Sequence, residues 1–359
     1  MKKLLTWVTC AAVALGVMAC GGTAEAVKES VPETTASKTE EASDADKENK
    51  YEKTGIPVKL RLGHAQPSDS ITNKAANDFA KLVDQATEGE LSIQVYPDST
   101  FGANADMVSG VESGDLDFFV SATAQFATQY KPISVVDAWY MFKDTDHLLR
   151  FYSPECEVYN RLMNGMRDAV GVDTLASFYY GARQMTANRT IKQVSDLNGM
   201  KMRVASDPMP TAFFKALGAV PTPVAYNETY LALQQKVADG EENPIISIQS
   251  MKFDEVQSDL ALTYHQHQMF NFFLSVATEK EKLNENQLAV LRMCAQTVAE
   301  QANMDAIAAE KSMIEAERSK LTVTEPDLEE FRTVCQSIYP EFEEIWGQGV
   351  ADSIQKLAE

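Results

Sequence analysis

The sequence has little of what catalytic and metal sites require. It contains four histidines and five cysteines among 359 residues. It has no Gly-x-Ser-x-Gly segment, no His-Glu-x-x-His segment and no glycine-rich phosphate-binding loop. His265 and His267 could share one face of a strand, but no cysteine or carboxylate motif accompanies them, which favours a structural role. We therefore expect no metal, no other cofactor and no catalytic activity.

Clusters of Lys and Arg are missing after residue 3, and the formal net charge is -20. Binding to nucleic-acid phosphates needs clustered cations, so a nucleic-acid partner is excluded. A small anionic ligand is compatible with this charge. Charges on the surface are screened over about 8 Å at physiological salt, whereas an arginine–carboxylate contact acts at hydrogen-bond distance and contributes roughly 1.5 to 3 kcal/mol. Local arginines can therefore outweigh the negative charge of the whole chain.

Only one long hydrophobic run stands out, at residues 4–19, directly after a basic start. It is too short for a stable transmembrane helix but typical of a secretory signal, so residues 1–19 are predicted to be a signal peptide. The run ends in Val-Met-Ala-Cys (residues 17–20), which resembles a bacterial lipobox. Cys20 is then the expected site of lipidation and the anchor to the membrane. A signal peptide cleaved nearby without a lipid is the alternative, and it also predicts export.

Residues 20–55 contain almost no large apolar side chains, which predicts a disordered tether behind the lipid anchor. Beyond it, three cysteines remain, Cys156, Cys294 and Cys335. An odd number means that at least one is free or pairs between molecules. A Cys294–Cys335 disulfide is one open alternative outside the cytoplasm.

The folded part is predicted to be α/β because strand and helix patterns alternate. Residues 57–63, 91–96 and 116–120 alternate as strands do, and helical patterns separate them. Strands separated by helices predict a doubly wound sheet. A second unit of this kind starts at Gly181, and the chain length suggests about two domains. Residues 286–321 contain no glycine or proline and predict a helix long enough to brace both.

Ligands of such sheets bind at the carboxyl ends of the strands. In the first unit, the loops at residues 64–69 and 121–125 follow such ends, and the region around residue 139 is a further candidate. A histidine in the first loop can equally serve the structure. The candidate ligand-binding residues of this half are His64, Ser121, Thr123 and Trp139.

The stretch from 181 to 244 combines turn signals with charges set among apolar residues. Arg183 and Arg203 both stand where a strand is expected to end. A helical apolar run over residues 230–237 stops at an Asp-Gly pair and places Asn243 next to a new strand. These features predict a polar cleft.

Five motifs in this stretch carry a resemblance to a known family. They are GARQMTA, LNGMKMRV, KALGAVPTPV, NETYLALQ and ADGEENP, at consistent spacing between residues 181 and 244. Together they resemble the extracytoplasmic solute-binding proteins of tripartite ATP-independent periplasmic (TRAP) transporters, the DctP-like family. The likeness extends in weaker form from about residue 58 to the long helix. It implies a two-lobed, periplasmic-binding-protein-like fold.

The resemblance implies a receptor that closes around one small organic acid and delivers it to TRAP permease subunits in the membrane, driven by an ion gradient. Lobe I is expected to comprise residues 57–180 and about 269–308. Lobe II with the C-terminal helices is expected to comprise residues 181–268 and about 309–359. The expected location is extracytoplasmic, in the periplasm or at the cell surface, with the chain anchored to the membrane as a lipoprotein. The alternatives are an exported lipoprotein used in adhesion or sensing, and an exported hydrolase with an unrecognised site.

The resemblance also implies residue roles. Arg203 occupies the place of the arginine that pairs with the ligand carboxylate, although alone it also suits a salt bridge. Arg183 is a second ligand contact or a hinge contact. Asn243 reaches the ligand or closes a turn, and Tyr226 packs on the ligand or in the core. The departures from the family pattern are Lys236, the segment DAWYMF at residues 137–142, and Asn104; the last two can face the cleft.

Overall fold

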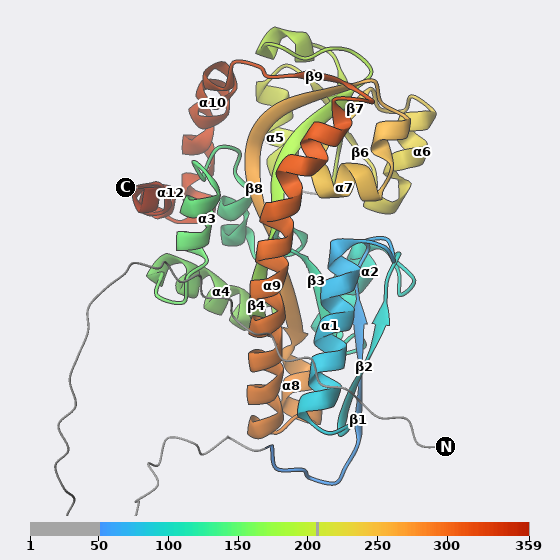
Figure 1. Ribbon diagram of the computed structural model, residues 1–359. Helices are drawn as coiled ribbons and strands as arrows, with labels where there is room; N and C mark the ends of the chain where they lie inside the picture. Colours follow the sequence, from blue (N-terminus) through green and yellow to red (C-terminus); the bar gives the residue numbers. More distant parts are fainter. Residues whose placement is uncertain (1–50, 206–207, 359) are drawn as a thin grey trace, which may run out of the picture. The chain divides into compact units, whose positions relative to one another are not determined.

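The computed structural model describes residues 51–205 and 208–358, which alternate between strands and helices as the sequence predicts (Figure 1). The strands are β1 (Val58–Gly63), β2 (Leu91–Tyr96), β3 (Phe118–Ala122), β4 (Val172–Ala187), β5 (Lys201–Val204), β6 (Val220–Pro223), β7 (Gly240–Pro244), β8 (Asp259–Ser275) and β9 (Thr322–Thr324). The α-helices are α1 (Ile71–Ala86), α2 (Asn104–Ser113), α3 (Thr145–Phe151), α4 (Glu157–Val170), α5 (Pro208–Ala216), α6 (Thr229–Gln234), α7 (Ile245–Ser250), α8 (Val276–Lys282), α9 (Glu285–Glu317), α10 (Leu328–Ser337), α11 (Glu343–Trp346) and α12 (Val350–Gln355). The predicted α/β class is confirmed.

The first half of the sheet holds β1 between β2 and β3, all parallel. Helix α1 covers these strands because its apolar side chains recur at helical spacing on one face. Its Phe79 ring lies 5.5 Å from the Phe118 ring in β3 and 5.0 Å from the Phe272 ring in β8, centroid to centroid. The Ser70 side chain accepts the backbone N–H of Asn73 and so caps the start of α1.

Two long antiparallel strands, β4 and β8, run through the centre of the sheet, whose order is β2-β1-β3-β8-β4-β7-β5-β6 with β9 beside β8. The sequence pattern predicts a strand over residues 174–180, a short strand near residue 260 and a separate apolar strand over residues 269–277. These segments instead belong to two continuous strands, of 16 and 17 residues. The polar stretch inside β8 is buried between neighbouring strands, so its polarity does not mark a loop.

The second half of the sheet holds β5 between β6 and β7 in parallel, and β7 pairs with β4 in the antiparallel direction. The apolar run that predicts a helix up to residue 237 forms α6, which ends earlier, at Gln234. Lys236 adopts φ +60°, a left-handed conformation that glycine adopts more readily. A glycine at this position would therefore serve the turn before β7.

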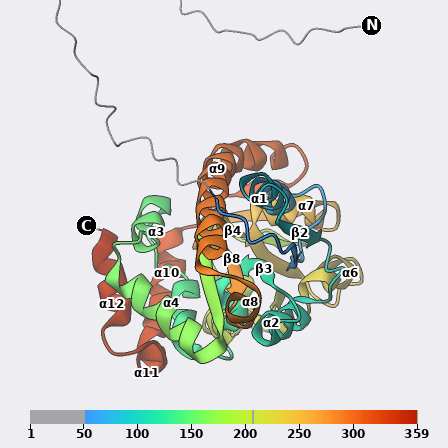
Figure 2. The same ribbon diagram turned by 90° about the horizontal axis from the view of Figure 1, so that it is seen from below.

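Helix α9 spans 33 residues, about 50 Å, and lies beside α1 and β4 (Figures 1 and 2). The side chain of Asn284 caps it through the backbone N–H of Gln287. Farther along, the carboxylate of Glu310 accepts the backbone N–H of Ala182 in β4 at 2.7 Å. The predicted bracing helix is confirmed, and it joins β4 by direct hydrogen bonds.

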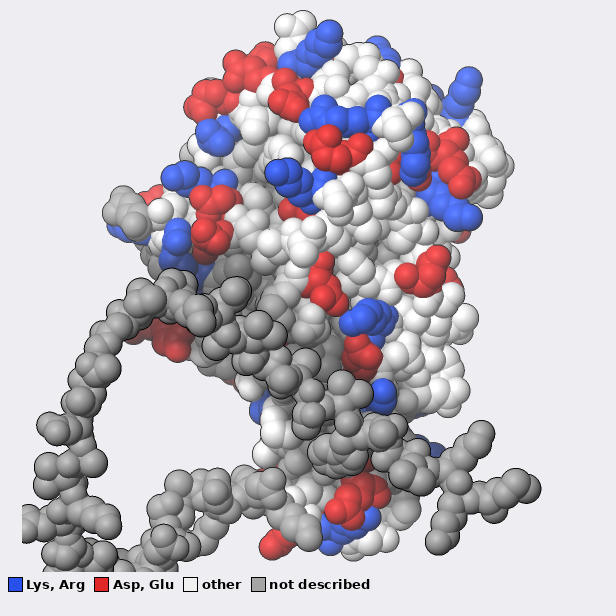
Figure 3. Space-filling view, in the orientation of Figure 1, with Lys and Arg blue, Asp and Glu red and all other residues white. Residues whose placement is uncertain are grey.

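The predicted signal peptide, Cys20 and most of the predicted tether lie outside the described residues. The ordered part begins before residue 57, because Tyr51, Thr54 and Gly55 all hydrogen-bond to Glu90. No helix in the described ranges is long and apolar enough to cross a membrane. On the face drawn in Figure 3, basic side chains lie next to acidic ones, and the described residues form no continuous basic surface there.

Cys156, Cys294 and Cys335 are all free thiols, so the Cys294–Cys335 disulfide is not formed. Cys294 is buried in α9 and Cys335 in α10. Burial raises the pKa of Cys294 to about 11 and raises that of Cys335 as well, so both thiols stay protonated at neutral pH.

Candidate ligand-binding site

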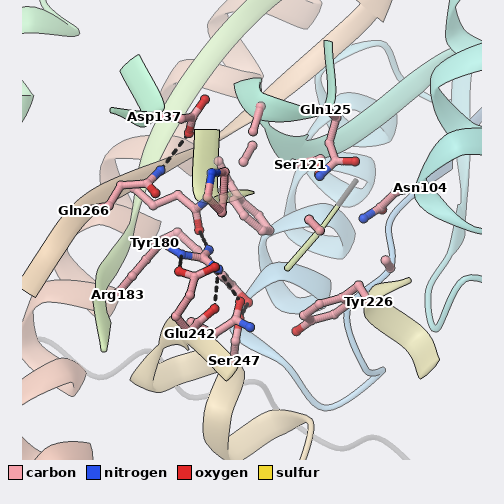
Figure 4. Close-up of a pocket in the computed structure, with 18 of the residues that line it drawn as sticks. Asn104, Ser121, Gln125, Asp137, Tyr180, Arg183, Tyr226, Glu242, Ser247 and Gln266 are labelled. Atoms are coloured by element: carbon pink, nitrogen blue, oxygen red, sulfur yellow. Dashed lines mark hydrogen bonds and ion pairs between the residues drawn. The ribbon is translucent and has the colours of Figure 1, made fainter. Parts of the chain in front are cut away.

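A pocket lies where the loops after β1 and β3 face the ends of β5 and β7 (Figure 4). About 70 Å³ is open to the centres of water-sized molecules, which leaves room for several small groups. The middle of β4 and β8 contributes Tyr180, Arg183, Gln266, Gln268 and Phe270. The pocket therefore occupies the carboxyl ends of parallel strands, as the sequence predicts for this sheet.

Arg203 stands near the end of β5 with only 2% of its surface exposed. Its Nε donates to the backbone oxygen of Val224 at 3.0 Å, whereas its Nη2 is buried without a hydrogen-bond partner among the described residues. The guanidinium carbon lies 6.0 Å from the centroid of the Tyr226 ring. Burial lowers the pKa of Arg203, and the charges of Glu241 and Glu242 oppose this. A buried guanidinium donor without an acceptor is costly, and a ligand carboxylate would satisfy it.

Arg183 is fully engaged by the protein. Its Nε and Nη2 donate to the two carboxylate oxygens of Glu242, the second at 2.9 Å. Nη1 donates to Gln268 at 2.9 Å, and Nη2 also donates to the amide oxygen of Asn243 at 3.1 Å. Burial lowers the pKa of Arg183, but Glu242 outweighs this, so the pKa is raised. Arg183 therefore resembles a structural ion pair more than a free ligand anchor.

Glu242 in β7 also accepts a hydrogen bond from His265 in β8, Nε2 to Oε2, at 3.0 Å. Burial alone would raise the pKa of Glu242, but Arg183 and this hydrogen bond lower it to about 2. Burial lowers the pKa of His265 despite its carboxylate neighbour. The Thr263 hydroxyl lies 2.7 Å from the other ring nitrogen of His265, Nδ1. His265 thus fixes Glu242 of the ion pair by a hydrogen bond from β8, which fits the structural role expected from the sequence.

Glu241 lies behind the pocket on the same short strand and is fully buried. It accepts hydrogen bonds from the Thr186 hydroxyl at 2.9 Å and from the Asn243 side-chain amide at 2.5 Å. Burial is the largest influence on it and raises the pKa of Glu241 to about 7, with Glu242 acting in the same direction. The Asn243 side chain is therefore held by Glu241 on one side and Arg183 on the other.

Tyr226 connects the two sides of the pocket. Its hydroxyl donates to the side-chain oxygen of Gln66, in the loop after β1, at 2.8 Å. Tyr226 itself follows β6, so this hydrogen bond joins the two halves of the sheet across the opening. Deeper in the pocket, the Tyr180 and Ser247 hydroxyls lie 3.0 Å apart.

The wall formed by the loop after β3 and the start of α2 is rich in uncharged polar groups. Ser121 and Gln125 follow β3, and Asn104 begins α2 (Figure 4). The amide oxygen of Asn104 is buried without a hydrogen-bond partner in the described residues. Next to this wall, Gln266 donates to the Asp137 carboxylate at 2.7 Å. Two of the positions where the sequence departs from the family pattern, Asn104 and the segment that begins at Asp137, thus line the pocket.

Five of the eight predicted binding residues line the pocket: Arg203, Arg183, Asn243, Tyr226 and Ser121. Three others are used elsewhere. His64 is buried and bonds Asn73 at the start of α1 at 3.2 Å, and the Thr123 hydroxyl lies 3.3 Å from that of Tyr152. Trp139 stacks on Phe213 of α5, with ring centroids 5.4 Å apart. Their side chains are occupied by packing and hydrogen bonds away from the lining.

Several lining residues were missed by sequence reasoning, namely Gln66, Asp137, Glu242, Gln266 and Gln268. Two of them had a readable signal. Period-two alternation in His-Gln-His-Gln places Gln266 and Gln268 on the face opposite His265 and His267, and the structure puts those glutamines in the pocket. Among the described residues, no group of three His, Cys, Asp or Glu is suited to a metal ion.

Comparison with known families gives one match over most of the chain. The family described as bacterial extracellular solute-binding protein, family 7 (DctP) matches residues 62–345. A curated relative, the sialic acid-binding periplasmic protein SiaP of Vibrio cholerae, is 30% identical over 302 residues, which cover 83% of this chain and 92% of the relative.

Solved structures give the same picture. A TRAP periplasmic solute-binding protein from Polaromonas sp. JS666 bound to D-erythronate is 29% identical with a TM-score of 0.76, and the match covers 83% of this chain and 98% of that protein. Another from Roseobacter denitrificans with bound L-galactonate is 25% identical with a TM-score of 0.77, covering 85% and 99%. The two-lobed fold expected from the resemblance is confirmed.

Proposed function

The chain belongs to family 7 of the bacterial extracellular solute-binding proteins, the DctP family of TRAP transporter receptors, and we propose that Arg203 is the residue with which it captures a small organic acid. The observation that carries this proposal is the buried Nη2 of Arg203, which has no acceptor among the described residues. The planar guanidinium matches a carboxylate through two parallel hydrogen bonds, a geometry that lysine cannot reproduce. The named ligands of the relatives above, sialic acid, D-erythronate and L-galactonate, are all organic acids, which supports this class of ligand.

Asn243, Tyr226 and Ser121 complete the proposed site. Asn243 is held in a fixed orientation by two partners, so its amide is pre-organised beside the ligand. Arg183 is proposed to act mainly by fixing Glu242 and Asn243, and these contacts favour the hinge role over the ligand contact among the two roles that the family resemblance implies. Pre-organisation of this kind improves affinity because fewer side chains lose freedom when the ligand binds.

Ligand binding is proposed to stabilise the closed arrangement of the two lobes. A ligand shifts such an equilibrium only to the extent that it binds one state better. The hydrogen bond between Tyr226 and Gln66 joins the two halves of the sheet at the pocket opening. This direct contact would stabilise the closed state. A carboxylate on Arg203 that also touches Ser121 on the other side would favour the same state. The proposed lobe boundaries remain those expected from the sequence.

The receptor is proposed to deliver its ligand to TRAP permease subunits and to be held at the membrane by a lipid on Cys20. The permease partner rests on membership of the family. The lipid rests on the lipobox-like residues 17–20, which lie outside the described residues. A tether of about 30 residues between Cys20 and the first ordered residues would let the binding domain reach a neighbouring permease.

The test is a thermal-shift screen of the whole exported chain against monocarboxylates, dicarboxylates, hydroxy acids, keto acids and sugar acids. An acid at 100 times its dissociation constant should stabilise the protein by about 2.7 kcal/mol. Arg203→Ala should abolish the shift, and Arg203→Lys should weaken binding at least about tenfold. The matched control is Lys201→Ala, because Lys201 lies on the same strand but is exposed. The proposal fails if no organic acid shifts the melting temperature, or if Arg203→Ala keeps the full shift.

A further inference from the structure

Glu241 is a buried carboxylate on the strand next to Arg203. Strands β5 and β7 run parallel and pair at Met202 and Gly240, so Arg203 and Glu241 follow side by side, one residue farther along each strand. Neighbouring residues of a parallel pair point to the same face of the sheet, on strands about 5 Å apart. Burial lowers the pKa of Arg203, and the Glu241 carboxylate opposes this more strongly than Glu242 does. Glu241 is therefore the main protein counter-charge of Arg203.

Hydrogen bonds also connect Glu241 to the pocket. Its side chain is fully buried and accepts from the Thr186 hydroxyl at 2.9 Å and from the Asn243 side-chain amide at 2.5 Å. Asn243 lines the pocket, and Glu241 stands behind it. A ligand in the pocket thus changes the charge around Glu241 without touching it.

The charged and titratable groups around Glu241 come from every strand of this half of the sheet. They are Arg203 in β5, Arg183 in β4, Glu242 in β7 and Tyr226 after β6; His265 of β8 contacts Glu242, and Asp137 acts on Arg183 from the pocket. Burial raises the pKa of Tyr226 to about 12 and lowers that of His265. Burial raises the pKa of Glu241 to about 7, so this carboxyl group titrates near neutral pH.

A ligand carboxylate on Arg203 changes the balance of charge at Glu241. It brings a second negative charge to the guanidinium that Glu241 stabilises, and like charges in a buried site repel each other strongly. The ligand also displaces water, which weakens the solvation of the Glu241 charge. Both effects favour the protonated form of Glu241.

We propose that Glu241 takes up one proton when the ligand carboxylate binds to Arg203, so that the receptor captures its acid together with a proton. This inference rests on the proposed function. The proton comes from solvent and bonds to the Glu241 oxygen that faces Thr186, whose hydroxyl then accepts the hydrogen bond instead of donating it. The other oxygen continues to accept from Asn243, so no neighbour has to move. Release of the ligand returns the proton to solvent.

The first test is the pH dependence of affinity, measured by titration calorimetry of the whole exported chain. The probes are sialic acid, D-erythronate and L-galactonate, the named ligands of the relatives above, together with the tightest-binding acid of the screen. With a coupling of about tenfold between the two carboxylates, the Kd should be about sevenfold higher at pH 8.5 than at pH 6. Affinity should become independent of pH below about pH 5.5, where Glu241 is protonated with and without ligand.

Proton uptake can also be measured directly. From a pKa of about 7, the same coupling raises the protonated fraction of Glu241 at pH 7.5 from about one quarter to about three quarters, or about half a proton per ligand. Binding enthalpies in HEPES and in Tris, whose ionisation enthalpies differ, give this number. Equal enthalpies in the two buffers, with the same Kd at pH 6 and pH 8.5, overturn the inference and leave an organic-acid receptor. No binding of any organic acid overturns the proposed function itself, and the inference with it.

The variant Glu241→Gln tests which residue takes up the proton. Glutamine resembles the protonated acid, so the variant should bind at pH 8.5 as tightly as the wild type at pH 6, with less than about twofold change over this range and no proton uptake. Glu112→Gln is the matched control, because burial also raises the pKa of Glu112, which lies on α2 outside the pocket lining. The control should keep the wild-type pH dependence. A wild-type pH dependence in Glu241→Gln overturns the assignment to Glu241, and the wild-type calorimetry decides on proton uptake whether or not this variant folds.

Discussion

Arg183 in β4 and Glu242 in β7 form a two-pronged ion pair in the pocket wall, with side chains that are 11% and 1% exposed. The two residues come from neighbouring strands of the second half of the sheet. Gln268, Asn243 and His265 complete the hydrogen bonds of the pair. A pair this well satisfied retains both charges in a buried site. Arg203 differs, because its Nη2 has no hydrogen-bond partner among the described residues.

Replacing one residue of the Arg183–Glu242 ion pair should therefore lower the stability of the folded protein. We expect Glu242→Gln to lower the free energy of unfolding by about 3 to 5 kcal/mol, because it leaves the Arg183 guanidinium buried beside a neutral amide. Chemical denaturation at neutral pH measures this. Glu315→Gln is the control, since Glu315 pairs with Arg318 on the exposed side of α9 and should cost no more than about 1 kcal/mol. Equal losses in the two variants would contradict the buried-pair interpretation.

Glu241 provides a second expectation, which concerns pH. It faces Arg203 and Arg183 as the nearby positive charges, and Glu242 and Tyr226 as the other titratable groups. Burial raises the pKa of Glu241 from 4.5 to about 7. Between these two values the folded protein binds a proton that the unfolded chain has lost, so the contribution of Glu241 to stability falls as the pH rises through that window. The full difference corresponds to about 3 kcal/mol.

Glu241→Gln should remove this pH dependence. A glutamine keeps both neighbours, because its oxygen can accept from Asn243 while its amide donates to the Thr186 hydroxyl. We expect the wild type to lose stability between pH 4.5 and 7 relative to the variant, by up to about 3 kcal/mol. Urea denaturation of both proteins at pH 5, 6, 7 and 8 measures the difference. Parallel curves for the two proteins over this range would show that Glu241 does not titrate there.

Part of the site was readable from the chain itself. Alternation around residue 203 and the repeated turn signals placed Arg203 near a strand end, and the Asp-Gly pair after the helical run placed Asn243 next to a new strand. Both signals are local, because strand period and turn chemistry depend on neighbouring residues. The same reasoning located the carboxyl ends of β1 and β3 as the opposite wall, where Ser121 was predicted and Asn104 and Gln125 also lie.

The residues that were not predicted depend on partners far away in the chain. The residues next to Glu242 in the sequence do not indicate that it is buried. Its ion-pair partner, Arg183, lies 59 positions earlier. Trp139 is a candidate ligand-binding residue in the sequence, but its ring packs against Phe213 and Phe214 of α5. The sequence predicts separate strands near residues 260 and 269, because only pairing with β4 shows that the segment between them belongs to one central strand. Single-sequence patterns contain no record of these pairings.

Gly181 lies at one of the three places where β4 shifts register against β8, and a third expectation follows from its surroundings. Its φ is +121°, and an added Cβ would lie 3.0 Å from the Cβ of Pro244 and 3.4 Å from a carboxylate oxygen of Glu310. Gly171, at the end of α4, also has a positive φ of +74°, but nothing lies within 4 Å of its added Cβ. Both glycines have a positive φ, but +74° lies close to the left-handed region that other residues can adopt and +121° does not, and only Gly181 also lacks space for a Cβ.

We expect Gly171→Ala to lower the free energy of unfolding by about 1 kcal/mol through backbone strain alone. Gly181→Ala should cost about 2 to 4 kcal/mol, because Pro244 belongs to the pocket strand β7 and can move only if β7 moves with it. Chemical denaturation of both variants gives the comparison. Since β7 also carries Asn243 and Glu242, Gly181→Ala should weaken ligand binding too, whereas Gly171→Ala should leave it unchanged. Equal stability losses with unchanged affinity would mean that the backbone at residue 181 is free to adjust, and that the register shift in β4 does not position the pocket.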